Sequence, residues 1–259
     1  MKKKLIGSMI ALLMIGIVIY FFAQKSPSQD NSTFIVGTAA GYAPFVSVNA
    51  SGEYEGFDID VAHALANKLN KKLVIKDLGS MTSLFMALDQ GMIDAIIWGI
   101  SITQDRLAKV AMIHYYGSTV TSYPLIFWKT IPTDIQSLTD MNNKIVCIEP
   151  GSSQDVVLLQ YPQIRTLQVD KIDDALLQIQ YGKADAAFVE PAIAIKFKNK
   201  YPEIQAVDIP LALSNQVQGM GVVIKKNKEQ LVHDVEQAIA VLKSAGTIEQ
   251  FAQKWEIPS

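Results

Sequence analysis

The chain has 259 residues, of which 49% are hydrophobic and 19% are charged, a composition typical of a globular protein and not of a disordered one. The formal net charge is -2, and without Lys2, Lys3 and Lys4 the rest of the chain has 20 basic and 25 acidic residues. This mildly acidic body argues against nucleic acid as a partner, because binding phosphates requires a basic surface.

The N-terminus carries a targeting signal. Lys2, Lys3 and Lys4 precede an apolar run from Leu5 to Phe22, which is typical of a secretory signal peptide or of an uncleaved membrane anchor. Both interpretations stay open, because the sequence that follows fits a cleavage site only in part. In either case the positive-inside rule predicts a periplasmic or other extracytoplasmic body, with membrane contact only through residues 5–22.

Residue types that bind metals or attack substrates are scarce. The single cysteine, Cys147, lies in an apolar stretch with strand character and is predicted to be a buried core residue. His63 and His233 fall in helical patterns, and His114 falls in a stretch that resembles a loop. None of them has metal-ligand spacing, so we predict no metal site and no cofactor.

The predicted elements alternate between strands and helices. A strand at 34–38 leads to the loop Gly41-Tyr42-Ala43-Pro44-Phe45, and a helix follows, with Asp58 as its expected N-cap. The next predictions are a strand at 73–75, a helix over about 83–90 that ends at Gly91, and a strand at 93–98. Alternation at these lengths predicts parallel β-α units.

A short internal repeat supports two such units. Residues 88–95 (LDQGMIDA) are similar to residues 179–186 (IQYGKADA). Each copy has a helix end, a glycine, two further residues, and Asp-Ala opening an apolar strand. The two strands end at Trp98 and Glu190. Because ligands bind beyond the carboxyl ends of parallel strands, we expect these two ends to face one cleft.

Four short motifs, in this order along the chain, are similar to those of a known protein family. They are Gly41–Phe45, Gly56-Phe57-Asp58-Ile59-Asp60, Ser101-Ile102-Thr103 with Arg106, and Gly219-Met220-Gly221. Together they resemble the periplasmic binding proteins for polar amino acids, of the lysine/arginine/ornithine and histidine type. The resemblance implies the α/β, two-lobed, type II periplasmic binding protein fold. It places the signal peptide or anchor with its linker at 1–32, lobe one at 33–119 and 218–259, and lobe two at 120–217.

The α-carboxylate of a free amino acid needs a cationic partner in the protein, and the α-ammonium needs an anionic one. Thr103 is a predicted N-cap that places Arg106 in a first helical turn, where its fork suits the α-carboxylate of a ligand. The resemblance gives Gly151-Ser152-Ser153-Gln154 a second contact with that carboxylate. It gives the α-ammonium to Glu190, although the family has Asp at this position.

The walls of the predicted cleft come from lobe one. The resemblance makes Tyr42 one aromatic wall and puts Met81 where the opposing aromatic usually stands. Trp98 occupies a position that is often small and polar, and core packing is an equally good explanation for Met81 and Trp98. Gly99 and Ser101 complete the predicted site.

The side chain of the ligand is inferred from where the predicted cleft has acidic residues, compared with the family pattern. The family often has an Asp at the position of Ala39, which argues against a cationic ligand. Glu149, however, stands in lobe two where the family has an uncharged residue. A carboxylate inside a closing cleft favours a basic side chain, and arginine fits best. If Glu149 instead faces solvent, a neutral ligand such as glutamine is expected.

The resemblance implies transport and not catalysis. We predict that the two lobes close on the free amino acid and that an ABC permease of the inner membrane recognises the closed form. A cleft enzyme resembling a dehydratase is the alternative, with Glu149 or Glu190 as its acid or base. A sensor module coupled to another chain is a further one.

Overall fold

The computed structural model describes residues 32–132 and 135–257. The predicted signal peptide or anchor at 5–22 lies outside this range. From Phe34 onward the described residues belong to one compact unit. None of the helices in the described ranges has the length and apolar composition that a membrane span needs.

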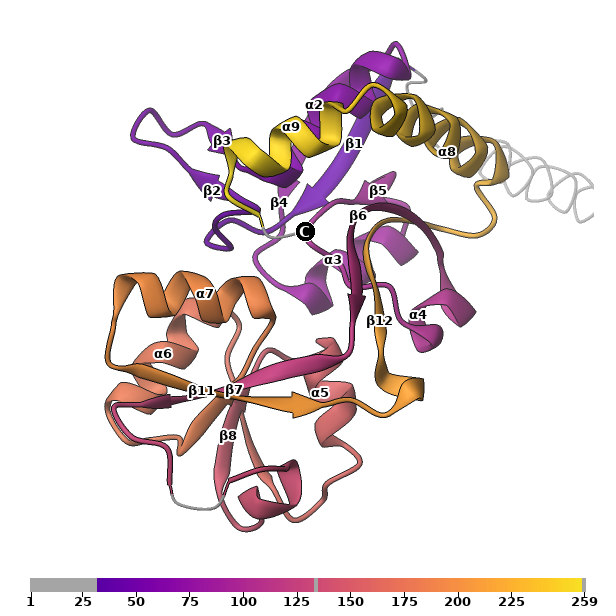
Figure 1. Cartoon of the computed structure of the whole chain (residues 1–259). Coiled ribbons are helices and arrows are strands. Elements are labelled where there is room, and N and C mark those ends of the chain that lie inside the picture. The colour runs from indigo at the N-terminus through magenta and orange to yellow at the C-terminus, as the bar shows by residue number, and fades with distance from the viewer. Residues whose placement is uncertain (1–31, 133–134, 258–259) are drawn as a thin grey trace, which may run out of the picture. The chain divides into compact units, whose positions relative to one another are not determined.

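The first sheet has the strand order β4-β1-β5-β12-β6 (Figure 1). Strands β1 and β5 are parallel, and β12 is antiparallel to both of its neighbours. Helices pack around this sheet, and a two-stranded ribbon, β2 with β3, lies beside it. The bounds are β1 Thr33–Thr38, β2 Ser47–Val48, β3 Tyr54–Glu55, α2 Phe57–Lys68, β4 Lys72–Asp77, α3 Met81–Asp89, β5 Ala95–Ile96, α4 Gln104–Lys109, β6 Ala111–Val120, β12 Val217–Ile224, α8 Glu229–Ser244 and α9 Thr247–Lys254.

The second sheet has the order β11-β7-β10-β8-β9. Its β10, β8 and β9 are parallel, and β7 is antiparallel to β10 and β11. The parallel β-α units predicted for the chain are therefore present in both sheets. The bounds are β7 Ser122–Trp128, η1 Leu138–Met141, β8 Ile145–Ile148, α5 Ser153–Leu158, β9 Arg165–Gln168, α6 Ile172–Gln180, β10 Ala186–Phe188, α7 Pro191–Lys200, β11 Ile204–Pro210 and η2 Leu213–Asn215.

Two long strands join the sheets. β6 pairs with β12 from Val217↔Val120 to Ile224↔Ala111, and Figure 1 shows them running side by side between the two sheets. The pairing has irregularities around Met220, where Gly219 has φ 74° and Gly117 on the partner strand has φ 87°. Glycine tolerates these positive φ values without a steric penalty, so the crossing can bend sharply there.

Both faces of the second sheet are buried, and side-chain alternation explains how. Along β7, Tyr123, Leu125 and Phe127 pack in one hydrophobic cluster, and Ile126 between them packs in the other. Successive residues of a strand point to opposite faces, so one strand serves two cores. Helices α6 and α7 cover the face of Ile126, and α5 with η1 covers the other. Cys147 is fully buried in β8, as predicted.

The internal repeat corresponds to one structural unit made twice. In the first copy the Asp94 carboxylate accepts a hydrogen bond from the Ile35 N–H at 2.9 Å. In the second, Asp185 accepts from the Ile145 N–H at 2.7 Å. Each aspartate thus ties the start of its own strand, β5 or β10, to the neighbouring parallel strand. The equivalence supports the expectation that the residues after these strands face one cleft.

Three local predictions need correction. Asp58 is not an N-cap: α2 begins at Phe57 after Gly56, and the Asp58 carboxylate is buried and accepts a hydrogen bond from the Tyr115 hydroxyl at 2.7 Å. The strand expected at 93–98 is only Ala95–Ile96, because the following residues turn toward the cleft. His114 lies in strand β6 and not in a loop.

Candidate functional site

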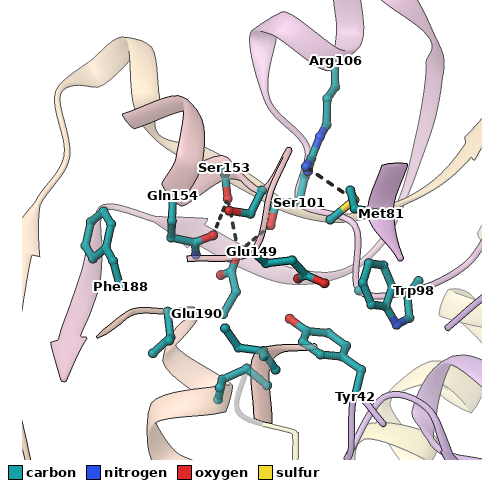
Figure 2. A pocket seen from close by; sticks show the side chains of 15 residues that line it. Tyr42, Met81, Trp98, Ser101, Arg106, Glu149, Ser153, Gln154, Phe188 and Glu190 are labelled. Atoms are coloured by element: carbon teal, nitrogen blue, oxygen red, sulfur yellow. Dashed lines mark hydrogen bonds between the residues drawn. The ribbon is translucent and has the colours of Figure 1, made fainter. Parts of the chain in front are cut away.

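One cavity of about 30 Å³ is lined by every residue proposed from the sequence. Figure 2 shows it between residues of the first sheet region and residues that follow strands of the second. The predicted residues are Tyr42, Met81, Trp98, Gly99, Ser101, Arg106, Glu149, Ser152, Ser153, Gln154 and Glu190. We call it the ligand cavity. That these residues contact a ligand stays a prediction, but the structure brings them all together.

Arg106 is the cation of the cavity. Thr103 caps α4 by accepting a hydrogen bond from the Arg106 N–H at 3.3 Å, so Arg106 lies in the first turn, as predicted. Its guanidinium donates to the carbonyls of Ser101 at 2.8 Å and Gly151 at 2.9 Å. The side chain is buried, and burial lowers its pKa from the usual value. A buried arginine with donors to spare is a suitable partner for a carboxylate.

Glu190 is the acid that is already hydrogen bonded. It follows β10, immediately before α7, and accepts hydrogen bonds from Ser101 at 2.8 Å and Ser153 at 3.3 Å. Burial raises its pKa, and the hydrogen bonds from Ser101, Gln154 and Ser153, together with Arg106, oppose the rise. The Ser101 contact links the first sheet region to the second across the cavity.

Glu149 is the acid of the cavity that has an unsatisfied oxygen. It follows β8, is only 7% exposed, and its Oε1 atom is buried without a hydrogen bond. Burial raises its pKa to about 8; Arg106 opposes the rise, and the nearby Glu190 and Asp170 add to it. A buried carboxyl group without a partner is costly, so this position favours a ligand that supplies a donor or a cation.

An aromatic wall stands opposite these acids. Tyr42 lies 5.2 Å from Phe45 and 5.1 Å from Trp98, measured between ring centroids. Trp98 is fixed by a hydrogen bond from its indole N–H to the Ala39 carbonyl at 2.8 Å. At Gly99, which has φ 56°, a Cβ atom would lie 3.2 Å from the Tyr42 ring. The glycine therefore lets the wall approach closely.

A second, smaller cavity of about 10 Å³ extends from this wall. It shares Tyr42, Trp98 and Glu149 with the ligand cavity and is otherwise bounded by residues that include Ala39 and Asp170. Beside Ala39, this cavity is therefore lined by two acids of the second sheet region, Glu149 and Asp170, and by Lys171. Asp170 was missed from the sequence, because nothing in its neighbourhood marks a rim residue.

Other cavity residues also escaped prediction. Phe188, Val189, Ile172 and Ile193 line the ligand cavity, and their apolar character gives no signal beyond core packing. Tyr123 supports the site from β7, because its hydroxyl lies 2.7 Å from that of Ser153. Within the described ranges, no group of three or more His, Cys, Asp or Glu residues could hold a metal ion.

The comparisons with known proteins decide the family. The family model described as bacterial extracellular solute-binding proteins, family 3, matches residues 34–257. The chain belongs to this family. It is therefore an amino-acid-binding protein of the ABC transporter type, and its folded part works outside the cytoplasm.

Relatives and solved structures agree. The chain is 32% identical, over 90% of its length and 89% of the relative's, to a probable ABC transporter arginine-binding protein, ArtJ, of Chlamydia trachomatis. It is 25% identical, over 88% and 82%, to the glutamine-binding protein GlnH of Bacillus subtilis. A mutant of the T. maritima arginine-binding protein superposes with a TM-score of 0.79 at 26% identity, covering 89% of this chain and 97% of that one. The predicted type II binding-protein fold is confirmed.

Proposed function

We propose that the chain binds free arginine, or another basic amino acid, and delivers it to an ABC permease. The observation that carries this proposal is Glu149, whose buried oxygen has no hydrogen-bond partner although it lines the ligand cavity. A cationic side chain would remove the cost of that unpaired group. Arginine fits best, because its planar fork binds a carboxylate with two hydrogen bonds.

The three charged groups of the cavity match the three charges of arginine. Arg106 receives the α-carboxylate, with Ser152, Ser153 and Gln154 beside it, and Glu190 receives the α-ammonium. The side chain then runs along Tyr42 and Trp98 toward Glu149, and its flat guanidinium gains cation–π contact with these rings. The name of the Chlamydia relative supports the same ligand.

Closure of two lobes is part of the proposal. A cavity of about 30 Å³ has room for only about two or three waters, since one water needs about 10–15 Å³. Arginine therefore enters only after the cleft opens. We assign lobe one to 33–119 and 218–259 and lobe two to 120–217, with β6 and β12 as the hinge. Solution scattering should show the protein becoming more compact with arginine, and an unchanged profile at saturation would contradict closure.

Titrations with arginine and glutamine test the ligand. In the wild type we expect arginine to bind more tightly. Glu149→Gln should weaken arginine by at least about tenfold, because a hydrogen bond to a charged group contributes about 1.5–3 kcal/mol. The exposed Glu203→Gln is the matched control and should change nothing. If glutamine binds better than arginine to the wild type, the proposal is wrong.

Glutamine is the second candidate. It is favoured by the GlnH relative and by the raised pKa of Glu149, because a protonated Glu149 can donate to a neutral amide. The same raised pKa would suit an acid or base in a cleft enzyme, and turnover of a candidate cyclic acid by the purified protein decides that alternative. Attachment of the chain to the membrane through 5–22 also stays a proposal.

A further inference from the structure

A much larger cavity opens beside the ligand cavity. Its volume is about 320 Å³, against about 30 Å³ for the ligand cavity. We call it the side chamber. The two share Tyr42, Gly99, Ser101 and Glu190, so they adjoin along these residues. The charged partners proposed for the free amino acid, Arg106, Glu149 and Glu190, all line the ligand cavity, and of these only Glu190 also lines the side chamber.

Glu190 stands at the junction. Glu190 lines both cavities, and its carboxylate accepts a hydrogen bond from Ser101, which also lines both. The α-nitrogen of the proposed ligand pairs with this carboxylate. A group attached to that nitrogen would consequently leave the ligand cavity at the junction and continue into the side chamber. Arg106 and Glu149, the proposed partners of the α-carboxylate and the side chain, line the ligand cavity and not the side chamber, so these contacts would not be disturbed.

The walls of the side chamber indicate what such a group is like. Hydroxyl groups come from Ser118 and Thr119 on β6, from Thr121 between β6 and β7, and from Ser122 at the start of β7. Apolar contacts come from Ala192 and Ile195 on α7, with others on β12. Apart from Glu190, none of the described residues that line the side chamber is charged. This lining suits a small alkyl or peptide group, and Glu190 is available as the partner of a single cationic nitrogen.

We propose that the site also takes arginine derivatives extended at the α-nitrogen, with the extension in the side chamber. This inference rests on the proposed function. Two kinds of compound have this chemistry. An N-alkyl derivative keeps a cationic nitrogen for Glu190, whereas a dipeptide with arginine at its C-terminus presents a neutral N–H and places its own ammonium in the side chamber, within reach of the same carboxylate.

Calorimetric titrations of the wild type separate the outcomes. The ligands are L-arginine, Nα-propyl-L-arginine and glycyl-L-arginine. We expect at least one extended ligand to bind within about tenfold of arginine, that is, within about 1.4 kcal/mol. The extended ligand that binds within this range shows which kind of compound the site takes, the N-alkyl derivative or the dipeptide. If arginine binds and both extended ligands are weaker by more than that, the side chamber holds only water and this inference is wrong, while the proposed function stands. If arginine itself does not bind, the proposed function fails, and the inference with it.

Filling the side chamber provides the second test. Ala192 lines the side chamber but not the ligand cavity, so Ala192→Phe should weaken the extended ligand by at least about tenfold through steric conflict. Arginine should change by no more than about twofold, as for a surface substitution. Ile195→Trp, at a residue 48% exposed, gives the same test if Ala192→Phe folds poorly. The control Leu177→Trp, at a residue 44% exposed outside both cavities, should affect neither ligand. Equal loss of both ligands in the filled variants would overturn the inference.

Discussion

Glu149 and Glu190 make an instructive pair. Both follow parallel strands that pair directly, β8 and β10, and both line the ligand cavity. Glu190 already accepts hydrogen bonds from two serines, one of them on the first sheet region. Glu149 has a buried oxygen, Oε1, that no described residue hydrogen-bonds. Two acids of the same type, in the same layer, are thus prepared for different tasks.

The difference follows from what each strand leads into. Glu190 precedes Pro191 at the start of α7, and serine hydroxyls surround its carboxylate, so it is positioned before any ligand arrives. Glu149 precedes Pro150 and Gly151, and its backbone carbonyl, not its side chain, closes the turn to Ser152. A positioned acid suits a group that every amino acid has, the α-ammonium. An acid without a partner suits the group that distinguishes one amino acid from another.

Arg106 faces both acids, and its removal should have the largest effect. Arg106→Ala should weaken every amino-acid ligand by about 2–5 kcal/mol, the range for truncating one partner of a buried charge pair. Calorimetry with arginine and glutamine measures it. Because Arg106 is buried and not exposed, we also expect a lower thermal stability, contrary to what a surface first-turn arginine would show.

The control for Arg106 lies on the same helix. Lys109 is exposed and forms an ion pair with Asp105 on the helix surface, so Lys109→Ala should leave both affinities unchanged. Arginine and glutamine that bind normally to a folded Arg106→Ala protein would contradict the carboxylate role.

Glu190→Gln should affect the affinities for arginine and glutamine differently from Glu149→Gln. It removes the charge that both ligands need for the α-ammonium, so we expect arginine and glutamine to lose affinity together, by about 1.5–3 kcal/mol each. Glu149→Gln should instead weaken arginine alone. Parallel titrations of the two variants test this comparison, and a loss confined to arginine in Glu190→Gln would reverse the assignment.

Much of this arrangement could be predicted from the sequence. The repeat at 88–95 and 179–186 marked the two strand ends, because the Asp-Ala step is a local pattern with a local cause, the hydrogen bond from Asp94 or Asp185 to the neighbouring strand. The cap at Thr103, which is also a local pattern, placed Arg106 in a first helical turn, while its ligand role came mostly from the family resemblance.

The missed features depend on distant contacts. Asp58 looked like an N-cap, but its partner Tyr115 is 57 residues away, and no local pattern records that contact. Asp170 and the side chamber likewise arise only where residues far apart in the chain meet. The sequence could name Glu149 as a cavity residue. It could not show that the Oε1 atom is buried without a hydrogen bond, because that depends on tertiary packing.

The smallest expected effect is a pH dependence that belongs to Glu149. In the cavity as the structure shows it, burial raises its pKa to about 8, so below that pH the carboxyl is mostly protonated there. Binding arginine requires the ionised form and therefore releases a proton. Between the lower pKa of the complex and about pH 8, arginine affinity should rise with pH by at most about tenfold per unit, or about 1.4 kcal/mol, and then level off.

Glutamine and Glu149→Gln isolate this effect. The pKa of Glu190 is also raised by burial, but Glu190 faces the α-ammonium of both ligands, so its contribution cancels in the ratio of arginine to glutamine affinity. Arg106, Asp170 and Tyr42 face Glu149 as well, and they too are the same for both ligands. The ratio should therefore rise toward pH 8 in the wild type and stay flat in Glu149→Gln. A flat ratio in the wild type would mean that Glu149 does not meet the side chain, whichever ligand binds more tightly.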